Sequence, residues 1–135
     1  MRVLTFLARS FSWEPFSQTL PDAPPASSGQ VRDAVVAFIQ VEAQDTADRS
    51  RTFRHVLKHL KWLANKKKFR NIVLHSFTHL GGENAAPDFA YELLMEIAHR
   101  LENTGYRVYI TPFGYFCAWQ LEVYGESLAK VYKAI

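Results

Sequence analysis

Two histidines and two hydroxyl groups gather in one short stretch of this sequence, His75-Ser76-Phe77-Thr78-His79. The apolar run Ile72-Val73-Leu74 before it predicts a buried strand, and Gly81-Gly82 after it predict a turn. Imidazoles and hydroxyls at the end of a buried strand are well placed to face a ligand. His75 and His79 could form an acid–base pair or a metal-binding pair. A structural, hydrogen-bonded role is the common alternative for a histidine at a strand end.

A second polar loop, Thr111 to Phe116, ends another predicted strand, and we expect the two loops to form one pocket. Cys117 follows this loop directly. It is either a plain core residue of a strand or a nucleophile, and a nucleophile would need a neighbouring base. We predict that His79 carries chemistry, that Thr78 shapes the pocket, and that Cys117 is the weaker catalytic candidate.

A third group of candidate residues lies on a predicted helix, where His55 and His59 stand four residues apart. That spacing can bind a metal, but no acidic or cysteine third ligand is near and lysines flank both histidines, so we expect no metal there. The opposite face is basic and is either a solvated surface or a contact for RNA phosphates. Its cations are Arg51, Arg54, Lys58, Lys61, Lys66, Lys67 and Lys68.

Hydrophobic periodicity predicts an α/β fold with helices packed on one side of a sheet. The predicted strands are 2–8, 34–42, 72–74, 106–111 and 116–124, and Phe11 and Trp13 continue the alternation of the first. Helices are predicted at 52–68 and 87–103, with a short one at 127–135. A Pro- and Ser-rich loop is predicted at about 15–30, inside one domain that spans residues 1–135.

Composition restricts the class of protein. The chain has 135 residues, 48% hydrophobic and 21% charged, which is typical of a globular domain. One cysteine cannot form an internal disulfide, and no apolar run is long enough for a membrane span, so we expect a cytoplasmic protein. No dinucleotide, P-loop, hydrolase-elbow or CxxC motif is present, and we expect no cofactor. The net charge of +3 permits an anionic partner without requiring one.

Four motifs carry a resemblance to a known family: Arg2-Val3-Leu4, Val36 to Ile39 with Val41-Glu42, Ser76 to Leu80, and Pro112 to Tyr115. In order and spacing they resemble the N-terminal editing domain of archaeal threonyl-tRNA synthetases, over nearly the whole chain. That family is similar in fold to D-aminoacyl-tRNA deacylases. The resemblance implies a three-layer β/β/α fold that forms homodimers.

The resemblance also implies an activity, the hydrolysis of serine wrongly attached to threonine tRNA. In that family the aminoacyl adenosine is held largely by backbone groups, and the 2′-hydroxyl of the RNA assists attack by water. The implied partners are misacylated threonine tRNA, a second copy of the chain and a threonyl-tRNA synthetase body. The residues implied to line the substrate pocket are Val41, Phe77, Thr78 and His79, with Phe113, Gly114, Tyr115 and Phe116 opposite.

Three positions depart from the family pattern. Cys117 replaces a lysine, Lys130 replaces a glutamate, and Leu7 stands where the family often has histidine. The first two changes remove a cation and an acid expected near the substrate, with Lys130 in the acid's place. Two alternatives therefore stay open: a D-aminoacyl-tRNA deacylase-like proofreader, and a binding module that keeps the fold without catalysis.

Overall fold

The computed structural model covers residues 1–135, and a long bent strand, β1 (Arg2–Gln18), organises it. β2 (Gly29–Gln40) pairs antiparallel with β1 along one edge, from Arg2 opposite Gln40 to Trp13 opposite Gly29. Two strands share the other edge: β6 (Lys130–Ala134) pairs with the first part of β1, and β5 (Tyr115–Val123) pairs with the second part. The order across the sheet is β4-β3-β2-β1-β5, with β6 also on β1.

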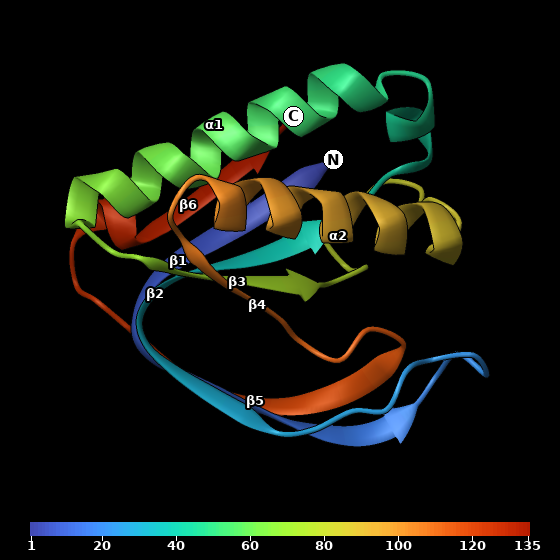
Figure 1. Ribbon diagram of the computed structural model, residues 1–135, viewed down its shortest axis with the longest axis horizontal. Helices are drawn as coiled ribbons and strands as arrows, with labels where there is room; N and C mark the ends of the chain where they lie inside the picture. Colours follow the sequence, from blue (N-terminus) through green and yellow to red (C-terminus); the bar gives the residue numbers. More distant parts are fainter.

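The remaining two strands, β3 (Asn71–Ser76) and β4 (Arg107–Ile110), run parallel to β2 on its far side. Two helices, α1 (Arg49–Lys67) and α2 (Pro87–Asn103), cover one face of this half of the sheet (Figure 1). Short 3₁₀ helices, η1 (Ala43–Thr46) and η2 (Ser127–Ala129), precede α1 and β6. Neither α1 nor α2 is both long enough and apolar enough to cross a bilayer.

The sheet bends so strongly that β5 and the adjoining ends of β1 and β2 form a separate layer below the rest (Figure 1). Register shifts in the β1–β5 pairing, between Ala8 and Ser10 and between Pro15 and Ser17, mark bulges that accentuate strand bending. The result is the predicted three-layer β/β/α arrangement. It confirms the α/β, three-layer fold class expected from the sequence.

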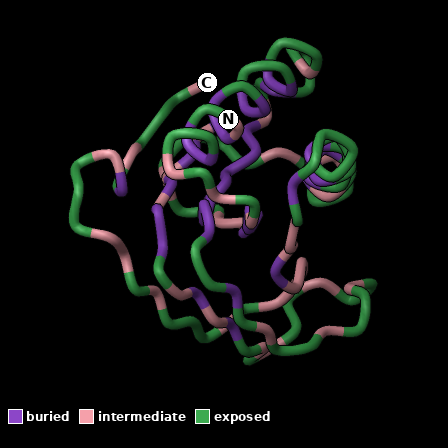
Figure 2. Tube along the Cα trace, turned by 60° about the vertical axis from the view of Figure 1, so that its left-hand side comes forward, coloured by how far each residue is buried: buried purple, intermediate pink, exposed green.

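Two hydrophobic cores fill the spaces between the three layers, and β2 contributes to both. Its residues Val35, Ala37 and Ile39 join the larger cluster under the helices, whereas Val36 and Phe38 face the smaller cluster between the β layers. This double coverage explains why residues 34–41 are almost all apolar. Figure 2 shows the same pattern, with buried residues concentrated in the central strands and the inner helix faces.

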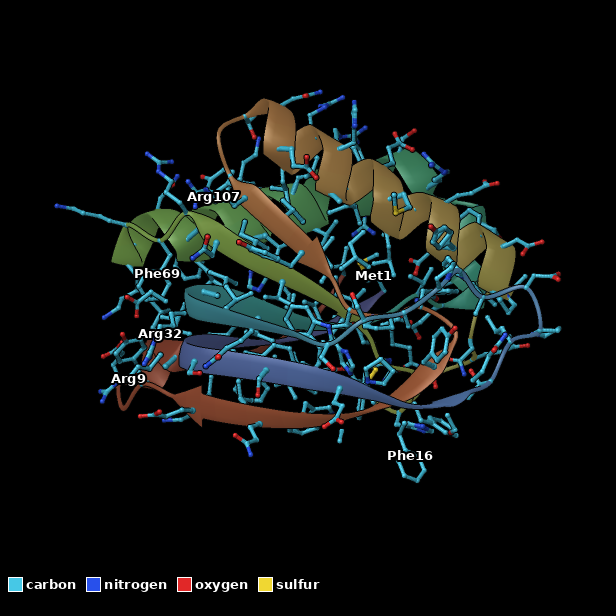
Figure 3. All side chains as sticks on the ribbon, turned by 60° about the horizontal axis from the view of Figure 1, so that its bottom comes forward. Met1, Arg9, Phe16, Arg32, Phe69 and Arg107 are labelled. Atoms are coloured by element: carbon cyan, nitrogen blue, oxygen red, sulfur yellow. The ribbon has the colours of Figure 1, made fainter.

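The predicted loop at about 15–30 is shorter in the structure and spans residues 19–28. Pro15 lies inside β1, opposite Cys117 and next to the bulge, a position where a strand tolerates proline. The adjacent Phe16 is 82% exposed and projects away from the sheet (Figure 3). The far end of the loop is held at Trp13, whose Nε1 donates a hydrogen bond of 3.2 Å to the Ser27 carbonyl.

The predicted terminal helix at 127–135 is wrong. Only the 3₁₀ turn η2 forms, and Lys130–Ala134 pair with Arg2–Phe6 as β6. Thr5 Oγ1 also donates to the Val131 carbonyl at 3.0 Å. Because β1 offers an open edge here, tertiary pairing overrides the weak local helix preference. In contrast, α2 has the predicted bounds, and β3 extends two residues past Leu74 to include His75 and Ser76.

Candidate active site

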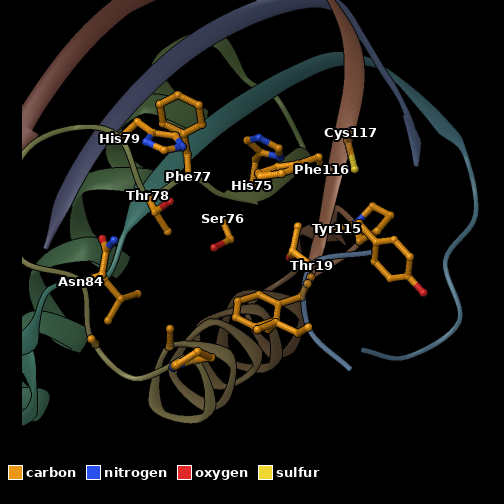
Figure 4. Close-up of a pocket in the computed structure, with 18 of the residues that line it drawn as sticks. Thr19, His75, Ser76, Phe77, Thr78, His79, Asn84, Tyr115, Phe116 and Cys117 are labelled. Atoms are coloured by element: carbon orange, nitrogen blue, oxygen red, sulfur yellow. The ribbon is translucent and has the colours of Figure 1, made fainter. Parts of the chain in front are cut away.

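A cavity of about 460 Å³ opens at the carboxyl end of β3 (Figure 4). One wall is His75 to His79 from the end of β3 and the loop after it. The opposite wall runs from Pro112 to Cys117, at the start of β5. Val41, Asn84–Ala85 and the first turns of α2 form the floor, and Thr19–Leu20 close the side. The two polar loops that the sequence singled out therefore line one cavity.

Most of the predicted site residues lie together in this cavity. They are Val41, Phe77, Thr78, His79, Phe113, Gly114, Tyr115, Phe116 and Cys117. Lys130 does not line this cavity, unlike the other residues predicted to bind substrate. It is the first residue of β6, opposite Phe6, and its ammonium lies 3.5 Å from the Gly125 carbonyl. The departure at Cys117 thus changes the cavity, whereas the one at Lys130 does not.

The loop after β3 is fixed at both ends but leaves its central amides free. The Phe77 N–H donates to the Ile39 carbonyl at 2.9 Å, and the Leu80 N–H donates to Gln40 Oε1 at 3.0 Å. Between them, the N–H groups of Thr78 and His79 donate to no other protein group. Both residues are exposed, so these amides are available to a ligand in the cavity.

Two polar side chains, the buried Gln40 and the half-buried Arg2, hold this loop in place. The Gln40 amide is 1% exposed, and its Nε2 donates to Asn84 Oδ1 at 2.7 Å. Arg2 donates to the Leu80 carbonyl at 3.2 Å and to Glu42 at the same distance. Gln40 and Arg2 therefore connect the loop to the rigid edge of the sheet.

Glu42 anchors this network from a nearly buried position. Its carboxylate also lies 3.0 Å from the Met1 ammonium. Burial raises the pKa of Glu42, but bonds to Met1 and Arg2 outweigh it and leave the pKa below its ordinary value. A Cβ on Gly82 would stand 2.1 Å from a Glu42 oxygen, which explains a glycine in the turn above this carboxylate.

A glycine is also required in the opposite wall. Gly114 has a φ of +84°, and a Cβ there would stand 2.8 Å from the Ala23 side chain. Its carbonyl accepts hydrogen bonds from the N–H groups of Thr19, at 2.7 Å, and Leu20, at 3.2 Å. The turn before β5 and the loop after β1 thus pack as one unit along the side of the cavity.

His75 is a buried part of the cavity wall, and its ring is held by its neighbours. Its ring packs against Phe38, with centroids 4.7 Å apart, and its Nδ1 lies 2.8 Å from Thr111 Oγ1. Burial lowers its pKa to about 4, so the imidazole is neutral at neutral pH. His79 instead packs edge-on against Phe77 at the surface. The two histidines are not part of any cluster of three side chains suited to a metal ion.

Cys117 lines the cavity as a partly buried thiol. Burial raises its pKa, which favours the neutral thiol over the nucleophilic thiolate. No lysine, arginine, aspartate or glutamate lines this cavity. Its polar groups are hydroxyls, one amide side chain, imidazoles and backbone N–H groups, which can bind a polar substrate and stabilise developing negative charge by hydrogen bonding.

The sequence did not single out several lining residues, among them Thr19, Asn84 and Trp119. Trp119 shares a strand face with Cys117, two residues away, so period-two alternation could have indicated it. Its ring packs edge-on against Phe38, with centroids 5.3 Å apart. Thr19 and Asn84 carry no local signal, because the folding of distant loops alone brings them to the cavity.

Comparison with solved structures identifies the class of fold. The c-Myc DNA Unwinding Element Binding Protein superposes with a TM-score of 0.70, over 100% of this chain and 99% of that one, at 12% sequence identity. At that identity the likeness concerns the fold alone, which is the three-layer fold described above.

Sequence comparison then gives the family. The archaea-specific editing domain of threonyl-tRNA synthetase matches residues 1–135, and the chain belongs to this family. Among curated proteins, the threonine–tRNA ligase of Thermococcus onnurineus is 30% identical over 139 residues and that of Thermococcus gammatolerans 31%, each covering 100% of this chain. The enzyme of Pyrobaculum calidifontis is 32% identical over 97% of it. The chain spans 22% of the length of each of these relatives.

Proposed function

We propose that this chain is an aminoacyl-tRNA editing hydrolase that removes serine from mischarged threonine tRNA. Family membership supports the editing role. The observation that carries the proposal is the pair of unpartnered amides, Thr78 N–H and His79 N–H, in the wall of a cavity that bears aromatic rings opposite. Such a cavity can hold an adenosine by stacking and place an ester carbonyl at the amides.

The reaction needs only water and the groups already present. A water oxygen attacks the ester carbonyl carbon, and the free amides donate hydrogen bonds to the oxygen that becomes negative. The bond from that carbon to the ribose oxygen then breaks. One proton of the water ends on this ribose oxygen, and the products are serine and uncharged tRNA.

The residues of the cavity divide these tasks by chemistry. His79 is exposed and can hold the attacking water or a ribose hydroxyl by hydrogen bonding. Phe113, Tyr115 and Phe116 offer rings for the adenine. No lysine or arginine lines the cavity. In this proposal the vicinal 2′-hydroxyl of the ribose therefore assists the attack by water, in place of an amine side chain.

The partners belong to the same proposal. The chain would act on the 3′ end of misacylated threonine tRNA, in the cytoplasm and together with a threonyl-tRNA synthetase body. It would do so as a homodimer. The sheet has unpaired edges at β4 and β5, which could join a second copy.

The decisive experiment is single-turnover deacylation of threonine tRNA carrying L-serine, compared with tRNAs carrying L-threonine or a D-amino acid. We expect release of L-serine only. Preferential release of a D-amino acid would replace the proposal by a D-aminoacyl-tRNA deacylase activity. Tight tRNA binding without any release would mean a binding module.

A further inference from the structure

A second hollow, of about 570 Å³, lies between α1 and β6, which run side by side (Figure 1). We call it the α1–β6 groove. Its lining residues are His55, Lys58, His59, Trp62, Val131, Tyr132 and Lys133. None of them lines the cavity described above, so the groove is a separate site.

The groove contains a polar atom without a partner. The His59 side chain is 5% exposed, and its Nε2 is the one buried side-chain nitrogen or oxygen in the chain that lacks a hydrogen-bond partner. Burying a polar group without a partner is unfavourable, and such groups are typically satisfied by water or a ligand. His59 therefore contributes an imidazole with an unsatisfied, enclosed nitrogen to the wall of the groove.

Charge at the groove selects an anion rather than a metal cation. His55 and His59 have metal-like spacing, but no third ligand completes a set. Lys58 and Lys133 also line the groove and repel a cation. Burial and then the charge of Lys133 both lower the pKa of His59, which keeps its imidazole neutral. The two ammonium groups thus favour a negatively charged ligand near an uncharged imidazole.

Two aromatic rings also line the α1–β6 groove. Trp62 is 45% exposed and Tyr132 is 51% exposed, although large aromatic side chains usually bury their rings. The Trp62 ring lies beside His59, with centroids 6.3 Å apart and planes inclined by 30°. A flat group stacked on Trp62 would therefore have its edge close to the imidazole.

We propose that the α1–β6 groove binds an unpaired nucleotide of RNA. The base stacks on Trp62, the phosphate pairs with Lys58 and Lys133, and His59 bonds the edge of the base or the ribose. Stacking platforms bordered by cations are the general means by which proteins hold single-stranded RNA. The proposal concerns a site apart from the proposed editing cavity and does not depend on hydrolysis there.

The test measures binding of a fluorescently labelled pentanucleotide of adenosine. Its 3′ end carries a phosphate, because the editing cavity is proposed to receive a 3′ end without one. We expect Trp62→Ala to weaken binding roughly tenfold or more. Lys58→Ala combined with Lys133→Ala should lower the salt slope by about 0.7 for each phosphate that is no longer neutralised. Arg107→Ala, which removes an exposed cation from β4 at the other edge of the sheet, serves as the charge control and should change little.

His59→Phe separates a binding role from a structural one. Removing the unpartnered nitrogen should raise Tm and, under the proposal, weaken RNA binding several-fold. A raised Tm with unchanged RNA binding would overturn the proposal. So would equal affinity for free adenosine monophosphate and for the pentanucleotide, which would define a mononucleotide site.

A shift to monomer in Trp62→Ala would also overturn the proposal, because it would assign the groove to an interface between copies. Deacylation of seryl-tRNA, measured in parallel, reports on the editing cavity alone.

Discussion

Thr78 and His79 are the residues on which the proposed chemistry depends, because their amides are free and their side chains stand at the cavity. Replacing His79 with Ala should remove one hydrogen-bonding group and reduce transition-state stabilisation by about 1–3 kcal/mol. Thr78→Leu should exclude substrate by steric overlap. Single-turnover deacylation of seryl-tRNA measures both effects, with a melting curve as the check on folding. Wild-type rates in both variants would place the chemistry elsewhere.

Cys117 tests whether the reaction is covalent. The raised pKa of its thiol argues against an activated nucleophile, although the side chain lines the cavity. We expect Cys117→Ala to deacylate seryl-tRNA within about threefold of the wild-type rate, an effect below about 1 kcal/mol. Complete loss of activity in a folded variant that still binds tRNA would restore covalent catalysis.

His75 should make stability depend on pH. Its pKa is about 4 in the folded chain and ordinarily 6.5, so the unfolded chain takes up the proton first as pH falls. The contribution of His75 to the free energy of unfolding is therefore fully present above pH 6.5. It is lost as the pH falls towards 4, by up to about 3 kcal/mol. The pKa of His59 is also lowered, so the measurement compares wild type with His75→Asn by urea unfolding between pH 7 and pH 5. Equal slopes in the two proteins would contradict the assignment.

At the scale of elements, the carboxyl end of α1 is the predicted basic contact for RNA, and the structure distinguishes its three lysines. Lys67 pairs with Glu126 at 3.0 Å and lies over the Tyr124 ring at 5.0 Å. Lys66 and Lys68 are exposed and form no ion pair. Lys66 and Lys68 can therefore bind RNA phosphates, whereas Lys67 already has an acidic partner.

Replacing Lys66 and Lys68 with Ala should weaken tRNA binding and reduce its salt slope by about one for each phosphate that these lysines neutralise. Lys67→Ala is the matched control, and its effect on the slope should be smaller. Fluorescence anisotropy with labelled tRNA at several salt concentrations gives the slopes. If neither variant changes the slope, this end of α1 is simply a solvated surface.

At the scale of the whole molecule, the proposed homodimer is the property to measure. The aromatic side chain of Phe16, on β1, is 82% exposed and lies outside the cavity, and interface centres are rich in such residues. Light scattering at micromolar concentration should give a mass near twice the 15.5 kDa of the chain. A monomer at all concentrations tested would refute this part of the proposal.

The sequence by itself determined the elements whose signals are local. The apolar stripe and the proline at its start set the bounds of α2, and the run 72–74 set the core of β3. The amphipathic pattern predicted α1 at 52–68, and the helix observed is Arg49–Lys67. These elements depend on neighbouring residues, so that periodicity and capping are enough to predict them. The meeting of the two polar loops in one cavity was expected from the family resemblance and not from local patterns.

Tertiary structure alone decided the features that depend on distant partners. The last residues pair with β1 instead of forming a helix, since this strand pairing joins the two ends of the chain. The same pairing removes Lys130 from the cavity. Thr19 and Asn84 reach the cavity only because separate loops meet there, and the depth of His75 is set by Phe38, Phe77 and Thr111 together. Local patterns contain no information about which surfaces meet, and for this reason burial, pKa and the full lining of the site emerged only from the folded chain.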